Sequence, residues 1–424
     1  MKVTKVSIKK IKDNPANPRV KLNDSDPEYH QIESSFKNYG NVQPLVWNEK
    51  TGFLVSGHQR LEILKAQGET EIDVVVVNLN SIEEKGLMIA LNRITGRWDY
   101  QQLAALLDDL TKMPEFDIQS VGFATPDLSN LFDNYLPEKE ENFDVDGELE
   151  KIIAPITKPG DLVILNDHRI LCSDSLNPAS FERLMDGKKV QLSCLDFPYS
   201  CGYVSGNRPS KKWKKRKLKK EFKIANDNLS QPDYEKFMKT VLSNIKKFMD
   251  EGSPLYCWNG FKQFSAMSGI LIELDFVLSN IITWVKPTAA ISYSDYNFQS
   301  EFCLYAWLKG NGPHRWYGST KESNVWEVNR EKLFEDYHPT VKPVELSERA
   351  IKNSSQRGDI VLSPFIGSGG DLIACEKLGR RCYGIELESK YVDLCVRRLG
   401  RYIGLEKLPN DIRNKYFKEA QNGK

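Results

Sequence analysis

A chain of 424 residues is too long for one ordinary hydrophobic core, so two domains are expected and a third is allowed. The formal net charge of +1 does not by itself indicate a nucleic-acid binder, although charge is uneven along the chain. The sequence has no apolar run of about 18 residues and its first 15 residues lack the apolar centre of a signal peptide, which favours a cytoplasmic protein with no membrane partner.

The first 136 residues predict a small α/β domain whose C-terminal half is helical. Residues 81–94 show the helical period, and Ser81 with Glu84 has the spacing of a capping box. The other expected elements are strand, turn and strand over 42–56, a helix from about residue 57, a strand over 72–79 and a helix over 99–110.

This region resembles the ParB N-terminal domain superfamily through NPANPR (14–19), VQPLVW (42–47) and SGHQRLEILKAQG (56–68). The superfamily includes nucleotide-binding domains, DNA-partition domains and sulfiredoxin. Sulfiredoxin chemistry needs a cysteine in the loop at residues 56–58, and the first cysteine of this chain is Cys172, so that activity is excluded.

Two interpretations of the loop stay open. His58 and Arg60 stand at the predicted start of a helix, where they would hold the phosphate of a nucleotide. Alternatively, they make local hydrogen bonds in a scaffold that contacts DNA.

The domain boundary is expected at residues 137–150, which hold seven acidic residues and one lysine and open with Pro137. Polar composition without periodicity is typical of a linker. The predicted organisation is therefore an N-terminal domain (1–136), an acidic linker (137–150) and a second domain (151–424).

The second domain shows alternating strand and helix patterns, which predict a doubly wound, Rossmann-like parallel sheet. A hairpin is expected over 160–174. The expected strands cover 190–197, 253–259, 276–286, 300–310, 359–365 and 381–387, and the expected helices cover 177–187, 234–249, 343–355, 370–379 and 389–404.

The strongest motif in this domain is a strand that runs into Gly367-Ser368-Gly369-Gly370 and then a helix, with Glu386 nineteen positions after Gly367. Glycines let the backbone approach a ligand, and an acid about 20 residues later is typical of ribose recognition. Leu372 stands where a dinucleotide fingerprint has its third glycine, so the loop suits a nucleoside without phosphates, such as S-adenosylmethionine.

Here the chain resembles the amino-group DNA methyltransferases, which usually carry Asp-Pro-Phe-x-Gly-Ser-Gly at this loop. The matching segments, in order, are HRILCSDS (168–175), NVWEVNR (324–330), YHPTVKPVELSERAI (337–351) and SPFIGSGG (363–370). Ser363 replaces the acid that helps to hold the methionine end of the cofactor, and Asp174 is expected to face its adenine. The resemblance implies S-adenosylmethionine contacts from Asp174, His338, Thr340, Lys342, Ser363, Phe365, Gly367, Ser368, Gly369 and Glu386.

The catalytic motif of that family, usually Asp-Pro-Pro-Tyr, corresponds to Asp196, Phe197, Pro198 and Tyr199. Its place before the cofactor motif is the permuted order of the β class. In the family, Asp196 and the carbonyl of the second position would accept the two amino hydrogens of a flipped base, on which Tyr199 would stack. Because Phe197 also has a carbonyl, we expect its main effect to be lost rigidity.

Two further segments are expected to approach DNA. Residues 211–220 hold eight Lys or Arg, among them Lys214, Lys215, Arg216 and Lys217, which suit phosphate contacts or form a solvated loop. Residues 284–318 are rich in aromatic side chains, and in the family the corresponding part closes over the substrate.

The resemblance implies a prokaryotic or phage enzyme that methylates the 6-amino group of adenine in DNA. The alternatives are a 4-amino cytosine methyltransferase and a catalytically weak DNA-binding regulator that retains the fold. A homodimer stays open as the assembly. The eight cysteines show no metal-ligand spacing, so no metal is expected, and no segment resembles a nuclease.

Overall fold

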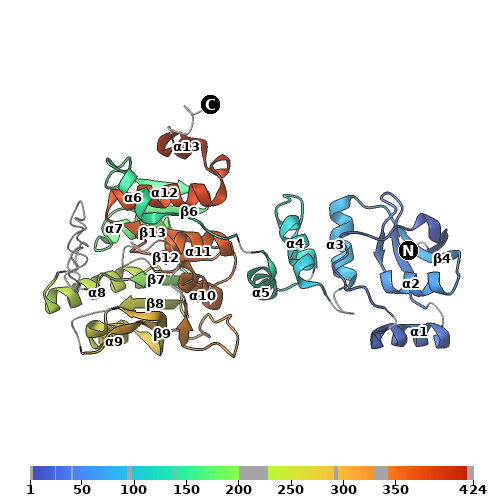
Figure 1. The fold of residues 1–424 in the computed structure, drawn as a ribbon, viewed down its shortest axis with the longest axis horizontal. Coiled ribbons are helices and arrows are strands. Elements are labelled where there is room, and N and C mark those ends of the chain that lie inside the picture. Colours follow the sequence, from blue (N-terminus) through green and yellow to red (C-terminus); the bar gives the residue numbers. More distant parts are fainter. Residues whose placement is uncertain are drawn as a thin grey trace. The chain divides into compact units, whose positions relative to one another are not determined.

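The computed structural model describes residues 3–23, 25–39, 42–92, 98–121, 123–137, 139–199, 228–290, 295–328 and 342–417. Internal contacts divide the chain into two compact units, Met1–Pro137 and Glu138–Lys424, and each has a sheet of its own (Figure 1). In the described part of the chain, no helix is both long enough and apolar enough to cross a bilayer.

The N-terminal unit is built on a sheet with the strand order β1-β4-β2-β3, in which β4 is antiparallel to β1 and parallel to β2. Helices α3, α4 and α5 enclose one apolar cluster, and a second lies between the sheet and α2. The elements are β1 (Val3–Ser7), α1 (Pro27–Tyr39), β2 (Leu45–Asn48), β3 (Leu54–Ser56), α2 (His58–Ala66), β4 (Glu71–Val77), α3 (Ser81–Asn92), α4 (Tyr100–Thr111) and α5 (Thr125–Tyr135).

Helix α3 is capped one residue earlier than its sequence predicts. The side-chain oxygen of Asn80 accepts the N–H groups of Ile82 and Glu83, both at 2.9 Å, while Glu83 accepts the N–H of Asn80 at 2.9 Å. The predicted pair of Ser81 and Glu84 is therefore wrong. Glu84 is instead buried and accepts hydrogen bonds from Asn14, Asn48 and Thr51.

The acidic segment expected to be a linker packs on the C-terminal unit. It forms helix α6 (Val145–Lys151), which lies against α12 (Ser389–Ile403), and Phe143 and Val145 are 4% and 2% exposed. Glu141 binds the guanidinium of Arg398 through two contacts of 2.6 and 2.7 Å. The linker prediction is therefore corrected, because the few apolar residues among the acids act as anchors.

The C-terminal unit contains a mixed sheet with the order β11-β9-β10-β8-β7-β12-β13-β6-β5. Strands β8, β7, β12, β13 and β6 are parallel, whereas β10 and β5 join them in antiparallel pairs. The strands are β5 (Leu162–Leu165), β6 (His168–Cys172), β7 (Leu192–Asp196), β8 (Pro254–Asn259), β9 (Phe276–Ala290), β10 (Phe298–Leu308), β11 (Val325–Glu327), β12 (Ile360–Ser363) and β13 (Arg381–Glu386). The parallel centre confirms the Rossmann-like prediction.

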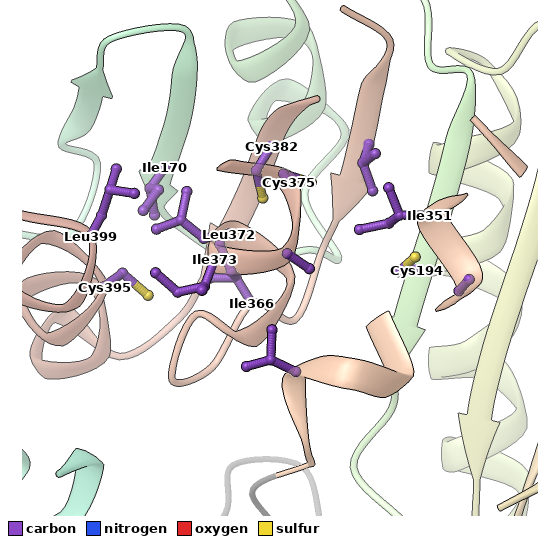
Figure 2. Packing of buried hydrophobic residues seen from close by; sticks show 14 of the residues in the cluster. Ile170, Cys194, Ile351, Ile366, Leu372, Ile373, Cys375, Cys382, Cys395 and Leu399 are labelled. Carbon is purple, nitrogen blue, oxygen red and sulfur yellow. The ribbon is translucent and has the colours of Figure 1, made fainter. Parts of the chain in front are cut away.

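Helices cover both faces of this sheet, and each face has its own apolar core. One core contains residues of α10, α11, α12 and α13, and the other contains residues of α7, α8 and α9. Figure 2 shows part of the first core, where Ile366 lies near Leu372 and Ile373. The remaining helices are α7 (Pro178–Met185), α8 (Gln231–Lys246), α9 (Phe264–Glu273), α10 (Val344–Ser354), α11 (Gly370–Leu378) and α13 (Asn410–Tyr416).

The seven cysteines that the structure describes are all buried and free of disulfide bonds. Within the described residues, no group of three or more His, Cys, Asp or Glu side chains is arranged to hold a metal ion.

Candidate active site

The two sequence motifs meet at the carboxyl ends of neighbouring parallel strands. Strand β7 ends at Asp196 and β12 ends at Ser363, and the strands pair through Leu192 with Val361 and Ser193 with Leu362. From β7 the chain passes through α8 to β8 on one side, and from β12 it passes through α11 to β13 on the other. Open α/β sheets form a ligand crevice where successive connections diverge in this way.

A network of acidic and basic side chains surrounds the catalytic motif. Lys342 donates from Nζ to Oδ1 of Asp196 at 2.5 Å and to the hydroxyl of Tyr199 at 2.9 Å. Tyr199 in turn donates to Oε2 of Glu301 at 2.9 Å, and Lys286 donates to Oε1 of the same carboxylate at 2.5 Å. Two carboxylates and two ammonium groups thus compensate one another around one tyrosine.

The protonation of this group follows from burial and from the neighbouring charges. Desolvation raises the pKa of the Asp196 carboxyl, and the Lys342 ammonium opposes that rise. Although burial acts against ionisation of Glu301, Lys342 and Lys286 lower the pKa of its carboxyl below the ordinary value. Burial acts against the charge of Lys342 as well, but Asp196 and Glu301 raise the pKa of its ammonium. Lys342 therefore stays a cation, and 39% of the Asp196 side chain remains exposed to a substrate.

Lys342 was expected among the cofactor contacts, but in this structure it contacts the catalytic motif. Lys342 lies just before α10, and α10 packs against α11 and β7. This packing places the Lys342 ammonium beside Asp196 at the end of β7. Sequence reasoning missed Glu301 and Lys286 as individual residues. Both lie in the aromatic-rich segment 284–318, but neither carries a motif of its own.

Phe197 is a core residue. Its side chain is 1% exposed, and its ring lies 5.0 Å from that of Phe365 and 6.0 Å from that of Phe237, measured between ring centroids. The ring therefore joins the catalytic strand to the cofactor loop and to α8. The expectation that this position matters mainly through its carbonyl and its rigidity is incomplete, because the ring fills space that proline would leave partly empty.

A tyrosine from α8 fixes the turn that follows Phe197. The hydroxyl of Tyr234 donates to the carbonyl of Pro198 at 2.5 Å and lies 3.0 Å from Oδ1 of Asn259. Asn259 ends β8, beside the end of β7. The motif turn is thus held by two neighbouring elements, which keeps Asp196 and Tyr199 in place before a substrate arrives.

The glycine loop has the open rim that a nucleoside needs. Gly367 and Gly369 have positive φ values of 52° and 86°, and Gly369 caps α11. A Cβ atom at Gly370 would meet no atom within 4 Å, and one at Gly367 would meet only the carbonyl of Phe365, at 4.0 Å. At Gly369 it would meet Sγ of Cys395 at 3.0 Å. The loop is therefore supported from one side and open on the other.

Glu386 stands at the end of β13 and faces this loop. Its Oε2 accepts the N–H of Gly367 at 2.9 Å, and its Oε1 accepts the N–H of Glu388 at 2.9 Å. Desolvation raises the pKa of the carboxyl to about 7, although both hydrogen bonds oppose the rise. A carboxylate has about four acceptor positions, so Glu386 retains capacity for two ribose hydroxyls. The residues present therefore fit the nucleoside part of S-adenosylmethionine.

The other predicted cofactor residues are placed as follows. Asp174 follows β6, which pairs with β13, so it lies at the same carboxyl end of the sheet as Glu386. Its carboxylate accepts a hydrogen bond from the N–H of Leu176 at 2.9 Å. The carbonyl of Ser368 accepts a hydrogen bond from Nη1 of Arg398 at 3.0 Å. His338, Thr340 and the basic residues Lys214, Lys215, Arg216 and Lys217 lie outside the described residues.

At the end of β12, Ser363 is hydrogen-bonded to an acid, Asp371. Its hydroxyl donates to Oδ2 of Asp371 at 2.6 Å, and the hydroxyl of Ser347 donates to Oδ1 of the same carboxylate at 2.5 Å. Asp371 lies in the first turn of α11 and is partly exposed. Its sequence position gave no signal, because an acid at the start of a helix usually serves the helix itself.

Comparison with known proteins finds two family models, several curated relatives and solved structures that resemble this chain. The family model described as DNA methylase matches residues 190–397, and that of the ParB N-terminal domain matches residues 1–92. The Type II methyltransferase M.HpaI of Haemophilus parainfluenzae is 25% identical over 274 residues, which cover 58% of this chain and 81% of that protein. M2.MboI of Moraxella bovis, also a Type II methyltransferase, is 27% identical over 191 residues, which cover 42% and 69%. The crystal structure of the M1.HpyAVI–SAM complex covers 54% of this chain and 98% of its own at 22% identity, with a TM-score of 0.40.

Proposed function

We propose that this chain, which belongs to the DNA methylase family and carries an N-terminal ParB-like domain, transfers a methyl group from S-adenosylmethionine to the 6-amino group of adenine in DNA. One observation carries the proposal: Asp196 ends β7 and the glycine loop follows β12, and these two parallel strands are direct neighbours in the sheet. A base held at Asp196 and a nucleoside held at Glu386 would then face each other.

The chemistry requires activation of a poor nucleophile, because the lone pair of an exocyclic amino group is delocalised into the ring. When bound, S-adenosylmethionine supplies an electrophilic methyl group on a sulfonium. Asp196 accepts one amino hydrogen, the carbonyl of Phe197 accepts the other, and the lone pair turns toward the methyl group. Transfer of the methyl group would leave a surplus proton on the amino nitrogen, and Asp196 would accept that proton. Preorganised acceptors of this kind lower the barrier without moving during the reaction.

Lys342 and Glu301 have positioning roles in this scheme. The Lys342 ammonium fixes one oxygen of Asp196, which leaves the other oxygen to the base. Glu301 and Lys342 both bind the Tyr199 hydroxyl, so the ring that is to stack on the base is held at its far end. The target base must leave the duplex to reach Asp196.

A methyl-transfer assay tests the function. The protein is incubated with labelled S-adenosylmethionine and unmethylated genomic DNA, and the nucleosides are then separated by mass. The adenine proposal expects N6-methyladenine, and N4-methylcytosine would support the cytosine alternative. If S-adenosylmethionine binds but no DNA is methylated, the chain is the catalytically weak regulator. Asp196→Ala is the control, since it keeps cofactor binding and loses turnover.

We also propose that the N-terminal unit contacts DNA and holds a nucleotide phosphate near the start of α2. Arg60 donates to the carbonyl of Gln43, and desolvation lowers the pKa of His58 to about 4, so His58 is neutral at pH 7. These observations favour local hydrogen bonding for Arg60. We therefore assign the phosphate contact to Arg19. Its guanidinium stacks on Trp98, 4.2 Å from the ring centroid. Its buried guanidinium nitrogens have no hydrogen-bond partner in the described part of the chain. Nucleotide titrations of the wild type and of Arg19→Met test this, and light scattering tests whether the chain forms the homodimer that its sequence leaves open.

A further inference from the structure

Asp371 lies at the one strand end that the methyl donor must cross. The order of strands in the sheet is β7, β12, β13, so the end of β12 stands between the catalytic Asp196 and the ribose acceptor Glu386. If S-adenosylmethionine bound with its ribose at Glu386 and its methyl group near Asp196, residues at the end of β12 would be the ones to hold its sulfonium and amino-acid part. The side chains at this point are those of Ser363 and Asp371, joined by a hydrogen bond of 2.6 Å.

We propose that Asp371 is the acid that binds the α-ammonium group of S-adenosylmethionine. It would replace the acid that the family motif has at the position of Ser363. The inference rests on the proposed function and adds to it a residue that the family motif does not contain at this position. Asp371 stands eight positions after Ser363, in the first turn of α11, and its hydrogen bond with Ser363 places its carboxylate at the end of β12.

The contacts of Asp371 are those of a carboxylate held ready for a cation. Ser363 and Ser347 donate one hydrogen bond to each of its oxygens, and these two donors come from different elements, β12 and α10. Two hydroxyl donors leave about two acceptor positions free on a carboxylate, enough for an ammonium group. The side chain is partly exposed, and the neighbouring Gly370 has no atom within 4 Å of an added Cβ, so a ligand has room beside it.

A role in helix capping does not account for this arrangement. The N-cap residue of α11 is Gly369, and both oxygens of Asp371 are engaged by hydroxyl groups of Ser347 and Ser363. The role of Ser363 is then to orient the acid. A serine at this position is short enough to leave the space that the displaced carboxylate occupies.

Ligand truncation provides the test. Binding of S-adenosylmethionine, S-adenosylhomocysteine and methylthioadenosine to the full chain is measured by calorimetry; the last of these lacks the amino-acid part. Asp371→Asn should weaken the first two by about 10-fold to 100-fold, the effect of losing a hydrogen bond between charged groups, and should leave methylthioadenosine unchanged. Unchanged methylthioadenosine binding also shows that the variant is folded. Glu386→Ala, by contrast, should weaken all three ligands.

An exchange of the two residues makes the test stricter. Ser363→Asp combined with Asp371→Ser returns the acid to β12 and should restore most of the affinity for S-adenosylmethionine, whereas Ser363→Asp alone places two carboxylates side by side and should lower it. Ser347→Ala is the matched control, because it removes one donor and keeps the charge. Equal affinity of the wild type and Asp371→Asn for S-adenosylmethionine would overturn the inference. Failure of the wild type to bind any of the three ligands would instead overturn the proposed function.

Discussion

The Nζ atom of Lys342 lies 2.5 Å from Oδ1 of Asp196, and the same ammonium contacts the hydroxyl of Tyr199 at 2.9 Å. One cation from the segment before α10 thus holds the first and last side chains of the catalytic motif. It also lies 3.8 Å from Glu301, so it compensates two acids.

Replacing Lys342 with Met should therefore shift the pH dependence of methyl transfer. Asp196 has to be ionised to accept an amino hydrogen, and the Lys342 ammonium lowers the pKa of that carboxyl against the effect of burial. Without the cation, the acid limb of kcat/KM should move to higher pH by about 1–3 units, the usual effect of a close opposite charge. Lys342→Arg keeps the charge and should move the profile less. An unshifted profile in Lys342→Met would remove Lys342 from the site.

Phe197→Pro should destabilise the protein instead of improving the motif. The Phe197 ring is buried against Phe237 and Phe365, and removing a buried phenylalanine ring typically costs about 3–5 kcal/mol of unfolding free energy. Phe197→Leu preserves most of the volume and should cost clearly less. Urea unfolding of both variants measures the difference. A Phe197→Pro variant with wild-type stability and higher turnover would show that the ring is dispensable.

Binding of S-adenosylmethionine should weaken as the pH falls below about 7. The pKa of Glu386 is raised to about 7 by desolvation, and the ionised carboxylate accepts stronger hydrogen bonds from ribose hydroxyls than the neutral acid does. Below that pH, part of the binding energy is used to remove the proton. Glu386→Gln should bind more weakly at pH 8 and lose the dependence on pH. Equal slopes of affinity against pH in the two proteins would contradict this assignment.

The acidic segment should behave as part of the C-terminal unit. A fragment that begins at residue 139 keeps Phe143 and Val145 in their apolar cluster, whereas one that begins at residue 152 loses them. Burial of such side chains contributes about 1.5–3 kcal/mol each, so the shorter fragment should unfold at a lower denaturant concentration. Limited proteolysis gives a second measurement, since cleavage within residues 141–151 should be slow. Rapid cleavage there would restore the linker interpretation.

The basic run should set the salt dependence of DNA binding. Replacing Lys214, Lys215, Arg216 and Lys217 with Ser should reduce the slope of log affinity against log salt by up to about 3–4, if all four neutralise phosphates. Filter binding at several salt concentrations measures the slope. Replacing four exposed lysines elsewhere in the C-terminal unit, Lys189, Lys236, Lys309 and Lys407, gives a control with the same change in charge. A slope like that of the wild type would leave the run as a solvated loop.

The sequence alone predicted most elements of the C-terminal unit, because buried strands and amphipathic helices leave periodic apolar patterns. It also predicted the glycine loop with Glu386, since both the spacing and the residue types are dictated by a nucleoside ligand. The permuted order of the motifs assigned the class. These signals lie in residue types, in their spacing and in their order along the chain, all of which can be read without the fold.

Contacts between distant segments were decided only by the tertiary structure. Lys342 and Asp196 are 146 positions apart, and nothing in either segment says that the ammonium reaches the carboxylate. Asp371 accepts a hydrogen bond from Ser347, 24 positions earlier in α10, as well as the 2.6 Å hydrogen bond from Ser363. The acidic composition of residues 137–150 suggested a linker, but a few apolar side chains decided otherwise. Burial depends on what the rest of the chain presents, and sequence periodicity does not record that for short or charged segments.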